Sequence, residues 1–185
     1  VLVPELNAVT LNNAANSLSG SGAGLTSLNA SQLASGTVPD ARLAASVART
    51  NQVWLLGGNA GTSSGTHFLG TSDNQALELK VNGARALRLE PTANSATVNV
   101  IGGSPYNAVG AGARGATIGG GGGDYFGSVS TNRVDANFGT ISGGFQNAIQ
   151  TGAANATLSG GYGNTIQPNA DYATLSGGGA NTIQP

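Results

Sequence analysis

The residues with the greatest capacity for chemistry in the C-terminal half of this sequence are three carboxylic acids. Asp124, Asp135 and Asp171 are the only acids after residue 103. Glycoside hydrolysis needs two carboxylates about 5–9.5 Å apart, but these three lie in different repeat units, each at a turn-like position where aspartate is structurally favoured. A polysaccharide depolymerase is therefore only a third hypothesis, and we predict that the chain is not an enzyme and has no catalytic residues.

Two glycine-rich motifs match ligand-binding patterns. "GAGARG" at residues 110–115 satisfies the G-x-G-x-x-G dinucleotide pattern, but the following "ATIGGGGG" disfavours the helix that this pattern requires, since each glycine costs about 1 kcal/mol relative to alanine. "GGGGGDYFG" at residues 119–127 fits one nonapeptide of a calcium-binding roll, but a single copy cannot supply ligands from successive turns. His67 is the only histidine. We therefore predict no cofactor and no metal ion.

One glycine-rich segment interrupts the repeats of the C-terminal part and carries side chains that we expect to be exposed. It runs from Gly120 to Thr131, "GGGGDYFGSVST", and is expected to be an insertion or a loop. It contains Asp124, Tyr125 and Phe126, and aromatic rings offer flat apolar faces on which sugars can stack. These three residues are the candidate ligand-contact loop for a glycan or a protein receptor on a host surface.

The composition limits the classes of partner. Charged residues make up 8% of the 185 residues, against about 25% in an ordinary soluble domain. Lys and Arg number 7 against 8 Asp and Glu, for a net charge of −1, and they are scattered singly. No basic stripe suits nucleic acid, and no apolar run approaches the ~18 residues that span a bilayer. With no cysteine, stability must come from packing, backbone hydrogen bonds or oligomerisation.

Two sequence markers recur in the C-terminal part. One is Asn-x-(Val/Ile) and the other is Thr-(Ile/Leu)-(Gly/Ser)-Gly, and the last members of both are 17 residues apart. A period kept by two independent markers indicates a repeat architecture. The markers predict a structural ladder made of Asn107, Asn132, Asn147, Asn164 and Asn181 and of Thr117, Thr140, Thr157 and Thr174.

Each repeat holds two short strand-like pieces, such as "NAI" and "ATLS", separated by turn-forming residues. Two strands and two corners make one coil of a β-solenoid. Regularly spaced threonines could also form an ice-binding face, but such a face would need at least two parallel files, and the repeats supply one threonine per coil. The large aliphatic residues are sparse, about two per coil, so the interior of a single chain would be thin. This predicts that identical chains share a core as a homotrimer.

Two further regions precede the repeats. Residues 51–103 hold six of the 15 charged residues and the only tryptophan, Trp54. There "LELKV" and "ARALRL" flank Asn82-Gly83, the strongest short hairpin signal, which predicts a hairpin at 77–89. Leu87 and Leu89 fall out of phase with the first strand, which indicates a bulge or burial of both faces. Residues 1–50 favour an extended, interwoven stalk, and Asp40 is an acceptable N-cap for a short helix over 40–49.

Several stretches resemble known fibre proteins. "NAIQTGAANATLSGGYG" and "NTIQPNADYATLSGGGA" resemble the YadA-like head repeats of trimeric autotransporter adhesins, which form a β-roll of three chains around one axis. "LNASQLASGTVPDARL" is similar to a segment common in phage tail fibres and related bacterial fibre proteins. "HFLGTSDNQALELKVNGARALRLEP" is similar to a module that precedes such repeats in large bacterial fibre proteins. The resemblance implies a trimeric surface or tail fibre.

The sequence therefore predicts an all-β, intertwined homotrimeric fibre. Its parts are an extended N-terminal stalk (1–50), a β-hairpin module (51–103) and a C-terminal β-roll or β-solenoid of about 17-residue repeats (104–185) that continues beyond the last residue. We expect a structural or adhesive fibre that gives a stiff extension outside the cell, on a cell-surface appendage or a phage- or tail-like particle. The alternative is a receptor- or glycan-binding tip. We expect no nucleic-acid partner and no membrane insertion in this segment.

Overall fold

The computed structural model describes residues 43–47, 53–93, 97–125 and 127–185. The chain divides into two compact units, Val1–Asn59 and Ala60–Pro185. In the first unit, residues 43–47 form a turn in which Val47 N donates to Ala44 O at 3.0 Å. The short helix expected over 40–49 is not seen in these residues, and positions 40–42 and 48–49, like most of the expected stalk, lie outside the described residues.

The described residues form an all-β structure. No helix of the length and hydrophobicity needed to cross a membrane occurs among them. The first two strands of the second unit are β1 (Leu77–Val81) and β2 (Ala84–Pro91), which pair antiparallel. Asn82 and Gly83 join them with φ values of 48° and 76°, as the left-handed positions of a tight hairpin turn require. The predicted hairpin is confirmed.

The hairpin contains the expected irregularity. Leu77 pairs with Leu89 and Leu79 with Leu87, but the register shifts between Leu79 and Lys80. An extra residue in one strand turns the side chains beyond it to the other face. The bulge therefore brings Leu87 and Leu89 onto the same face as the leucines of β1, and it confirms one of the two explanations that the sequence offered.

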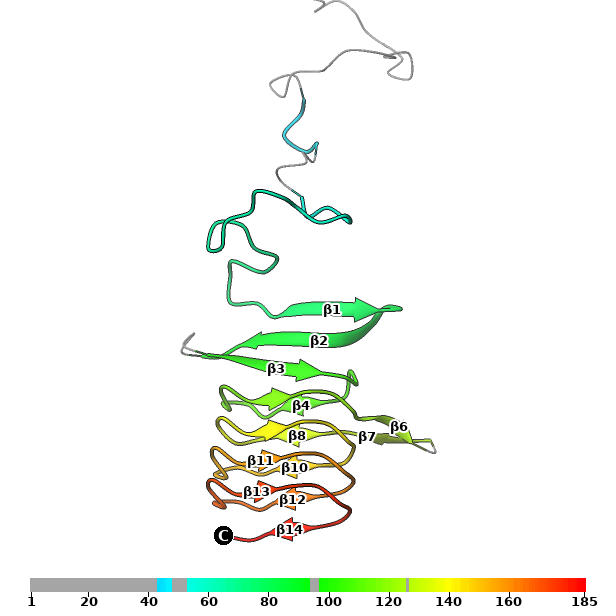
Figure 1. Cartoon of the computed structure of the whole chain (residues 1–185), viewed down its shortest axis with the longest axis vertical. Coiled ribbons are helices and arrows are strands. Elements are labelled where there is room, and N and C mark those ends of the chain that lie inside the picture. Colours follow the sequence, from blue (N-terminus) through cyan, green and yellow to red (C-terminus); the bar gives the residue numbers. More distant parts are fainter. Residues whose placement is uncertain (1–42, 48–52, 94–96, 126) are drawn as a thin grey trace, which may run out of the picture. The chain divides into compact units, whose positions relative to one another are not determined.

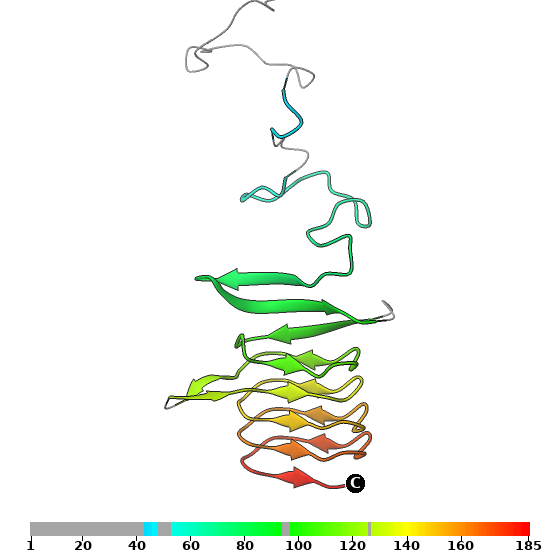
Figure 2. The same cartoon turned by 180° about the vertical axis from the view of Figure 1, so that it is seen from behind.

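A β-solenoid of five coils follows the hairpin (Figures 1 and 2). Each coil contributes one short strand to each of two parallel sheets. The first sheet contains β3 (Val98–Gly102), β5 (Thr117–Ile118), β9 (Thr140–Ile141), β11 (Thr157–Leu158) and β13 (Thr174–Leu175). The second contains β4 (Ala108–Val109), β8 (Arg133–Val134), β10 (Ala148–Ile149), β12 (Thr165–Ile166) and β14 (Thr182–Ile183).

The hairpin is continuous with the first of these sheets. β3 pairs antiparallel with β2 on one side and parallel with β5 on the other. The seven-stranded sheet therefore runs from β1 through the hairpin into the solenoid without a break. The expected boundary between a module ending at residue 103 and repeats starting at 104 falls inside the first coil, between β3 and β4.

The core is a narrow stack of aliphatic side chains between the two sheets. In each complete coil, one Ile, Leu or Val from each strand points inward, and alanines fill the corners. Ile118, Ile141, Ile149, Leu158 and Ile166 are each 0% exposed. A single chain therefore closes its own interior, and the sequence argument that two aliphatics per coil leave it too thin is wrong. Buried alanines such as Ala116, Ala153 and Ala156 complete the packing between the two sheets.

Two coils depart from the 17-residue period, for opposite reasons. The interval from Asn107 to Asn132 is longer because β6 (Gly123–Tyr125) and β7 (Ser128–Ser130) form an inserted antiparallel hairpin. The interval from Asn132 to Asn147 is shorter because the corner between β8 and β9 lacks two residues. In Figures 1 and 2 the inserted hairpin projects from the side of the solenoid, as expected of an insertion.

Candidate functional site

The predicted asparagines form a buried file along one corner of the solenoid. In each of the last four, the backbone N–H donates to Oδ1 of the asparagine one coil earlier, at 2.9–3.1 Å. Each Nδ2 group donates to a glycine carbonyl of its own corner, and the first four also donate to one of the next corner. Asn107, Asn132, Asn147 and Asn164 are at most 2% exposed. This part of the predicted ladder is present and fully hydrogen-bonded, as buried amides must be.

The glycines beside this file are required by space as well as by conformation. Gly144 and Gly161 have φ values of 75° and 89°, which favour glycine. A Cβ on Gly144 would collide with the carbonyl oxygen of Gly161, and one on Gly161 with that of Gly178. These glycines are therefore corners of the scaffold, where one coil touches the next.

The predicted threonines stack in register on the first sheet. Thr117 pairs with Thr140, Thr140 with Thr157, and Thr157 with Thr174. Each alternates with a buried aliphatic residue, so the threonines lie on the outer face. The file continues upward through Val100, which pairs with Thr117, to Leu89 of the hairpin.

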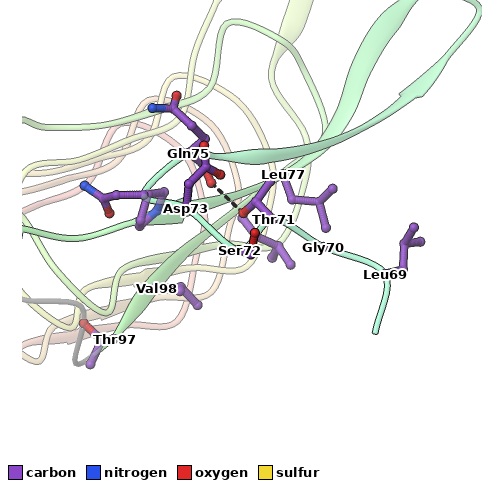
Figure 3. Close-up of a pocket in the computed structure, with 12 residues that line it drawn as sticks. Leu69, Gly70, Thr71, Ser72, Asp73, Gln75, Leu77, Thr97 and Val98 are labelled. Atoms are coloured by element: carbon purple, nitrogen blue, oxygen red, sulfur yellow. Dashed lines mark hydrogen bonds between the residues drawn. The ribbon is translucent and has the colours of Figure 1, made fainter. Parts of the chain in front are cut away.

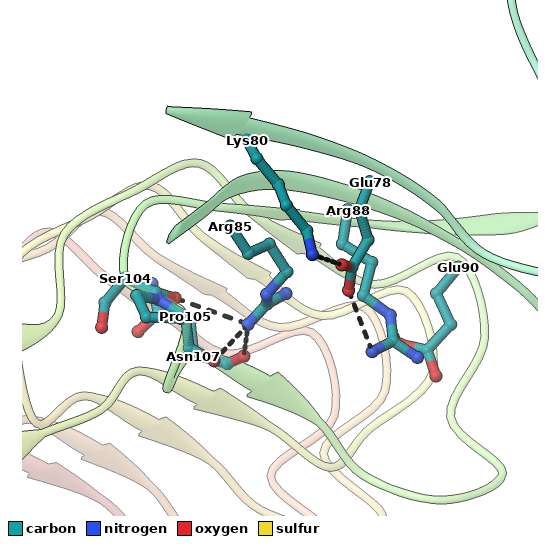
Figure 4. A network of polar contacts seen from close by, with 8 residues as sticks. All are labelled: Glu78, Lys80, Arg85, Arg88, Glu90, Ser104, Pro105 and Asn107. Carbon is teal, nitrogen blue, oxygen red and sulfur yellow. Dashed lines mark hydrogen bonds and ion pairs between the residues drawn. The ribbon is translucent and has the colours of Figure 1, made fainter. Parts of the chain in front are cut away.

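A cluster of charges covers the N-terminal end of the core (Figure 4). Arg88 pairs with Ile101, the first aliphatic of the core, so the inward face of the hairpin is charged where the solenoid's inward face is apolar. Nη2 of Arg85 donates to the carbonyl oxygens of Pro105 at 2.6 Å and Asn107 at 2.8 Å, and lies 3.5 Å from that of Ser104. Glu78 pairs with Lys80 and Arg88. These charges form a cap for the first coil.

The predicted ligand-contact loop lies on the inserted hairpin. Asp124 pairs with Val129 in the ladder, and its Oδ1 accepts a hydrogen bond from Gly127 N at 2.8 Å. Asp124 therefore has a role in closing the turn. The side chain of Tyr125 and the whole of Phe126 lie outside what the structure describes.

The other two acids of the C-terminal half also have local partners. Asp171 accepts a hydrogen bond from Ala154 N at 2.7 Å, across a corner between neighbouring coils. Asp135 accepts one from Nε of Arg133 at 2.8 Å. The three carboxylates thus lie in three different turns or corners, and each holds a local structure. Within the described residues, no group of three or more His, Asp or Glu could hold a metal ion.

A cavity, which we call the notch, opens at the corner after β8, where this shorter coil lacks a turn that its neighbours have. The corner after β8 passes from Val134 to Thr140, whereas its neighbours carry the extra turns at 111–112 and 151–152. The resulting cavity of about 440 Å³ is lined by Gly110, Ala111, Gly112, Ala113, Arg133, Asp135, Ala136, Asn137, Thr151, Gly152 and Ala154. A Cβ on Gly110 would collide with Oδ1 of Asp135, so glycine makes room for this carboxylate.

A second hollow lies on the outer, apolar face of the hairpin (Figure 3). Its volume is about 490 Å³, and the loop at 69–75 forms one wall. The opposite wall is formed by Leu77, Leu89, Pro91, Thr97 and Val98. Thr71 Oγ1 donates to Gln75 O at 2.9 Å, which holds the loop in its curved form.

The Arg85 cap, the notch and the hollow on the hairpin were absent from the sequence-based prediction. The Arg85 cap joins residues 19 to 22 positions apart that belong to no repeat, so periodicity carries no signal of it. The notch did leave a signal, because the Asn132 to Asn147 interval is two residues short of 17. The charged pair of Arg133 and Asp135 is a second signal of this coil, because the matching positions of the other coils hold neutral residues.

The chain was compared with known proteins at three levels. No match was found among protein-family models, among curated proteins or among solved structures.

Proposed function

We propose that this chain is a structural segment of a homotrimeric extracellular fibre, which provides stiffness and reach without catalysis. The observation that supports this proposal is the unbroken stack of five coils, tied by the buried asparagine file. In such a solenoid each coil contacts only its neighbours, and the repeated interface sums along the axis. A rod of this kind suits a mechanical task better than a chemical one.

Association of copies is supported by the outer face of the hairpin. Leu79, Val81 and Val98 are 45%, 70% and 53% exposed, and they lie near the leucines that the bulge aligns. Exposed apolar faces of this kind mark interaction sites. The other copies of the chain are the occupants that we propose, because the resemblance of the repeats is to trimeric fibres.

The oligomeric state tests this proposal. Size-exclusion chromatography with light scattering, at submicromolar concentration, is expected to give three times the mass of the 18.0-kDa chain. Negative-stain images are expected to show thin rods. A compact monomer at all concentrations would contradict the trimer, while a monomeric rod would leave only the scaffold role.

A receptor- or glycan-binding tip is the second candidate, favoured by the projecting hairpin of β6 and β7. Gly122 N still donates to Gly144 O, and Asn132 N to Asn107 Oδ1, so the coil is intact on both sides of the insertion. Deleting residues 123–130 would restore the 17-residue period. This variant is expected to keep its melting temperature and lose binding to cells or glycan arrays. Unchanged binding would count against the hairpin as the contact site.

A further inference from the structure

The notch at the short coil combines a missing turn with a charged floor. The coils on both sides of the notch carry a projecting turn, so the notch has two walls and opens outward. Among the described residues after 103, the pair of Arg133 and Asp135 is the only ion pair, and it lies in this gap. Positions that match Asp135 in the next two coils are Gln150 and Gln167.

The floor is held in a fixed geometry. Nε of Arg133 donates to Oδ2 of Asp135 at 2.8 Å, and Nη2 lies 2.7 Å from Oδ1. The second contact is an ion pair but lacks the angle of a hydrogen bond, so Oδ1 is buried without a hydrogen-bond donor. The side chains of Arg133 and Asp135 are 52% and 24% exposed. A guanidinium has five N–H donors, so Arg133 retains donors for a ligand.

The walls add both polar and apolar groups. Asn137 Oδ1 accepts the N–H of Arg114 at 3.2 Å, which fixes the amide and leaves its Nδ2 donors available. Thr151 adds a hydroxyl, and Ala111 and Ala154 add methyl groups, whereas Ala136 is buried in the core. The volume of about 440 Å³ falls in the range of about 300–1,000 Å³ that ligand sites occupy.

We infer that the notch is a binding site for a neutral sugar ring. A pyranose has hydroxyls that both donate and accept, which match the donors of Arg133 and Asn137 and the acceptor Oδ2 of Asp135, and its C–H faces match the methyl groups of Ala111 and Ala154. The charges of Arg133 and Asp135 cancel, so the site has no net attraction for a charged ligand. A divalent cation would need several oxygen ligands, and the carboxylate is already paired with Arg133. This inference does not depend on the trimer proposal.

Saturation-transfer NMR on the intact chain tests the site. The probes are the methyl α-glycosides of glucose, galactose, mannose, rhamnose and N-acetylglucosamine. At least one probe is expected to receive saturation from the protein. Inserting Thr-Gly between Asp135 and Ala136, which copies the turn at 151–152, is expected to fill the notch and weaken that binding by about ten-fold or more. Asp135→Asn, which keeps the cavity, is expected to weaken it to a similar degree.

The matched control is Gln167→Ala, at the position equivalent to Asp135 in a coil with a full-length turn. It is expected to bind as the unaltered chain does. Ala111→Gln narrows the notch from an exposed wall position and serves if the insertion variant fails to fold. Absence of saturation transfer from every probe overturns the inference. So does full binding by the folded insertion variant, or by Ala111→Gln in its place, whereas a monomeric chain that binds a probe contradicts only the trimer.

Discussion

Oδ1 of Asn147 accepts two hydrogen bonds from Asn164 in the next coil, from the backbone N–H at 3.1 Å and from Nδ2 at 3.2 Å. Nδ2 of Asn147 donates at the same time to the carbonyls of Gly143 at 3.1 Å and Gly161 at 2.9 Å. One side chain therefore joins its own corner, the next corner and the next rung of the file. Its position in every repeat follows from this triple role.

Replacing one rung of the file should be costly. Asn164→Ala leaves the carbonyl of the buried Gly160 and the N–H of Asn181 without their partner, and it removes one of the two donors to the carbonyl of Gly178, which keeps the N–H of Tyr162. Unsatisfied buried groups cost about 1–3 kcal/mol each, so we expect a loss of about 2–4 kcal/mol in the free energy of unfolding, measured by urea denaturation. Asn181→Ala, at an exposed rung, is the control. Equal losses in the two variants would contradict the argument.

Adjacent glycines should differ sharply in tolerance. Gly144→Ala places a methyl group against the next coil at a φ of 75°, and the left-handed strain and overpacking together predict a loss of about 2–5 kcal/mol. At Gly143 an added Cβ meets nothing within 4 Å, so Gly143→Ala should change stability by less than about 1 kcal/mol. Thermal melts followed by circular dichroism would compare the two. A similar melting temperature for both would show that the corners are not in close contact.

The cap at the N-terminal end of the core should protect the first coil. Arg85→Met removes the Nη2 donor from the carbonyls of Pro105 and Asn107, and a charged hydrogen bond contributes about 1.5–3 kcal/mol. Hydrogen exchange of the amides of Ser104 and Asn107 should accelerate by about ten-fold or more, with the last coils unchanged.

Lys80→Met is the control for the cap. The side chain of Lys80 is 56% exposed and pairs only weakly with Glu78, at 3.6 Å. Exchange at the first coil should therefore change little. Faster exchange in both variants would mean that net charge, rather than the Arg85 contacts, protects this coil.

The apolar face of the hairpin should control association. Leu79 is 45% exposed, so Leu79→Asp should lower the stability of a single chain by no more than about 1 kcal/mol. Buried between copies, the same carboxylate would be unpaired and would dissociate the trimer. Light scattering would detect the change. Thr174→Asp, on the outer face of the solenoid, should leave the mass unchanged, and a trimeric Leu79→Asp variant would exclude this face as the interface.

The repetitive part of the fold could be predicted from the sequence, because each residue of a file meets the same environment in every coil. The asparagine and threonine markers identified the rungs, Asn82-Gly83 identified the hairpin, and the out-of-phase leucines indicated a bulge as one of two explanations. The interior could not be judged, because the number of large side chains says nothing of the distance between the sheets. Alanines such as Ala153 and Ala156, both 0% exposed, fill much of that space.

The candidate site was the harder part to predict. Asp135 was recognised as one of three acids, but its place in a cavity depends on the missing turn beside it. Only the spacing of Asn132 and Asn147 records that missing turn. Contacts of the Arg85 cap depend on how the hairpin meets the first coil, and no local pattern encodes such a meeting.

The asparagine file gives the solenoid a direction. Every bond along it has the same sense, with the N–H of the later coil donating to Oδ1 of the earlier one. The file is therefore polar: each rung presents Oδ1 to the coil that follows, and the N–H of the first rung, Asn107, is already bonded to Ser104 O at 3.0 Å. Any junction that carries the file from one stack into another must be head to tail, and a head-to-head meeting would oppose like groups. The direction in which such stacks could join thus follows from the hydrogen bonds of one type of side chain, the asparagine amide.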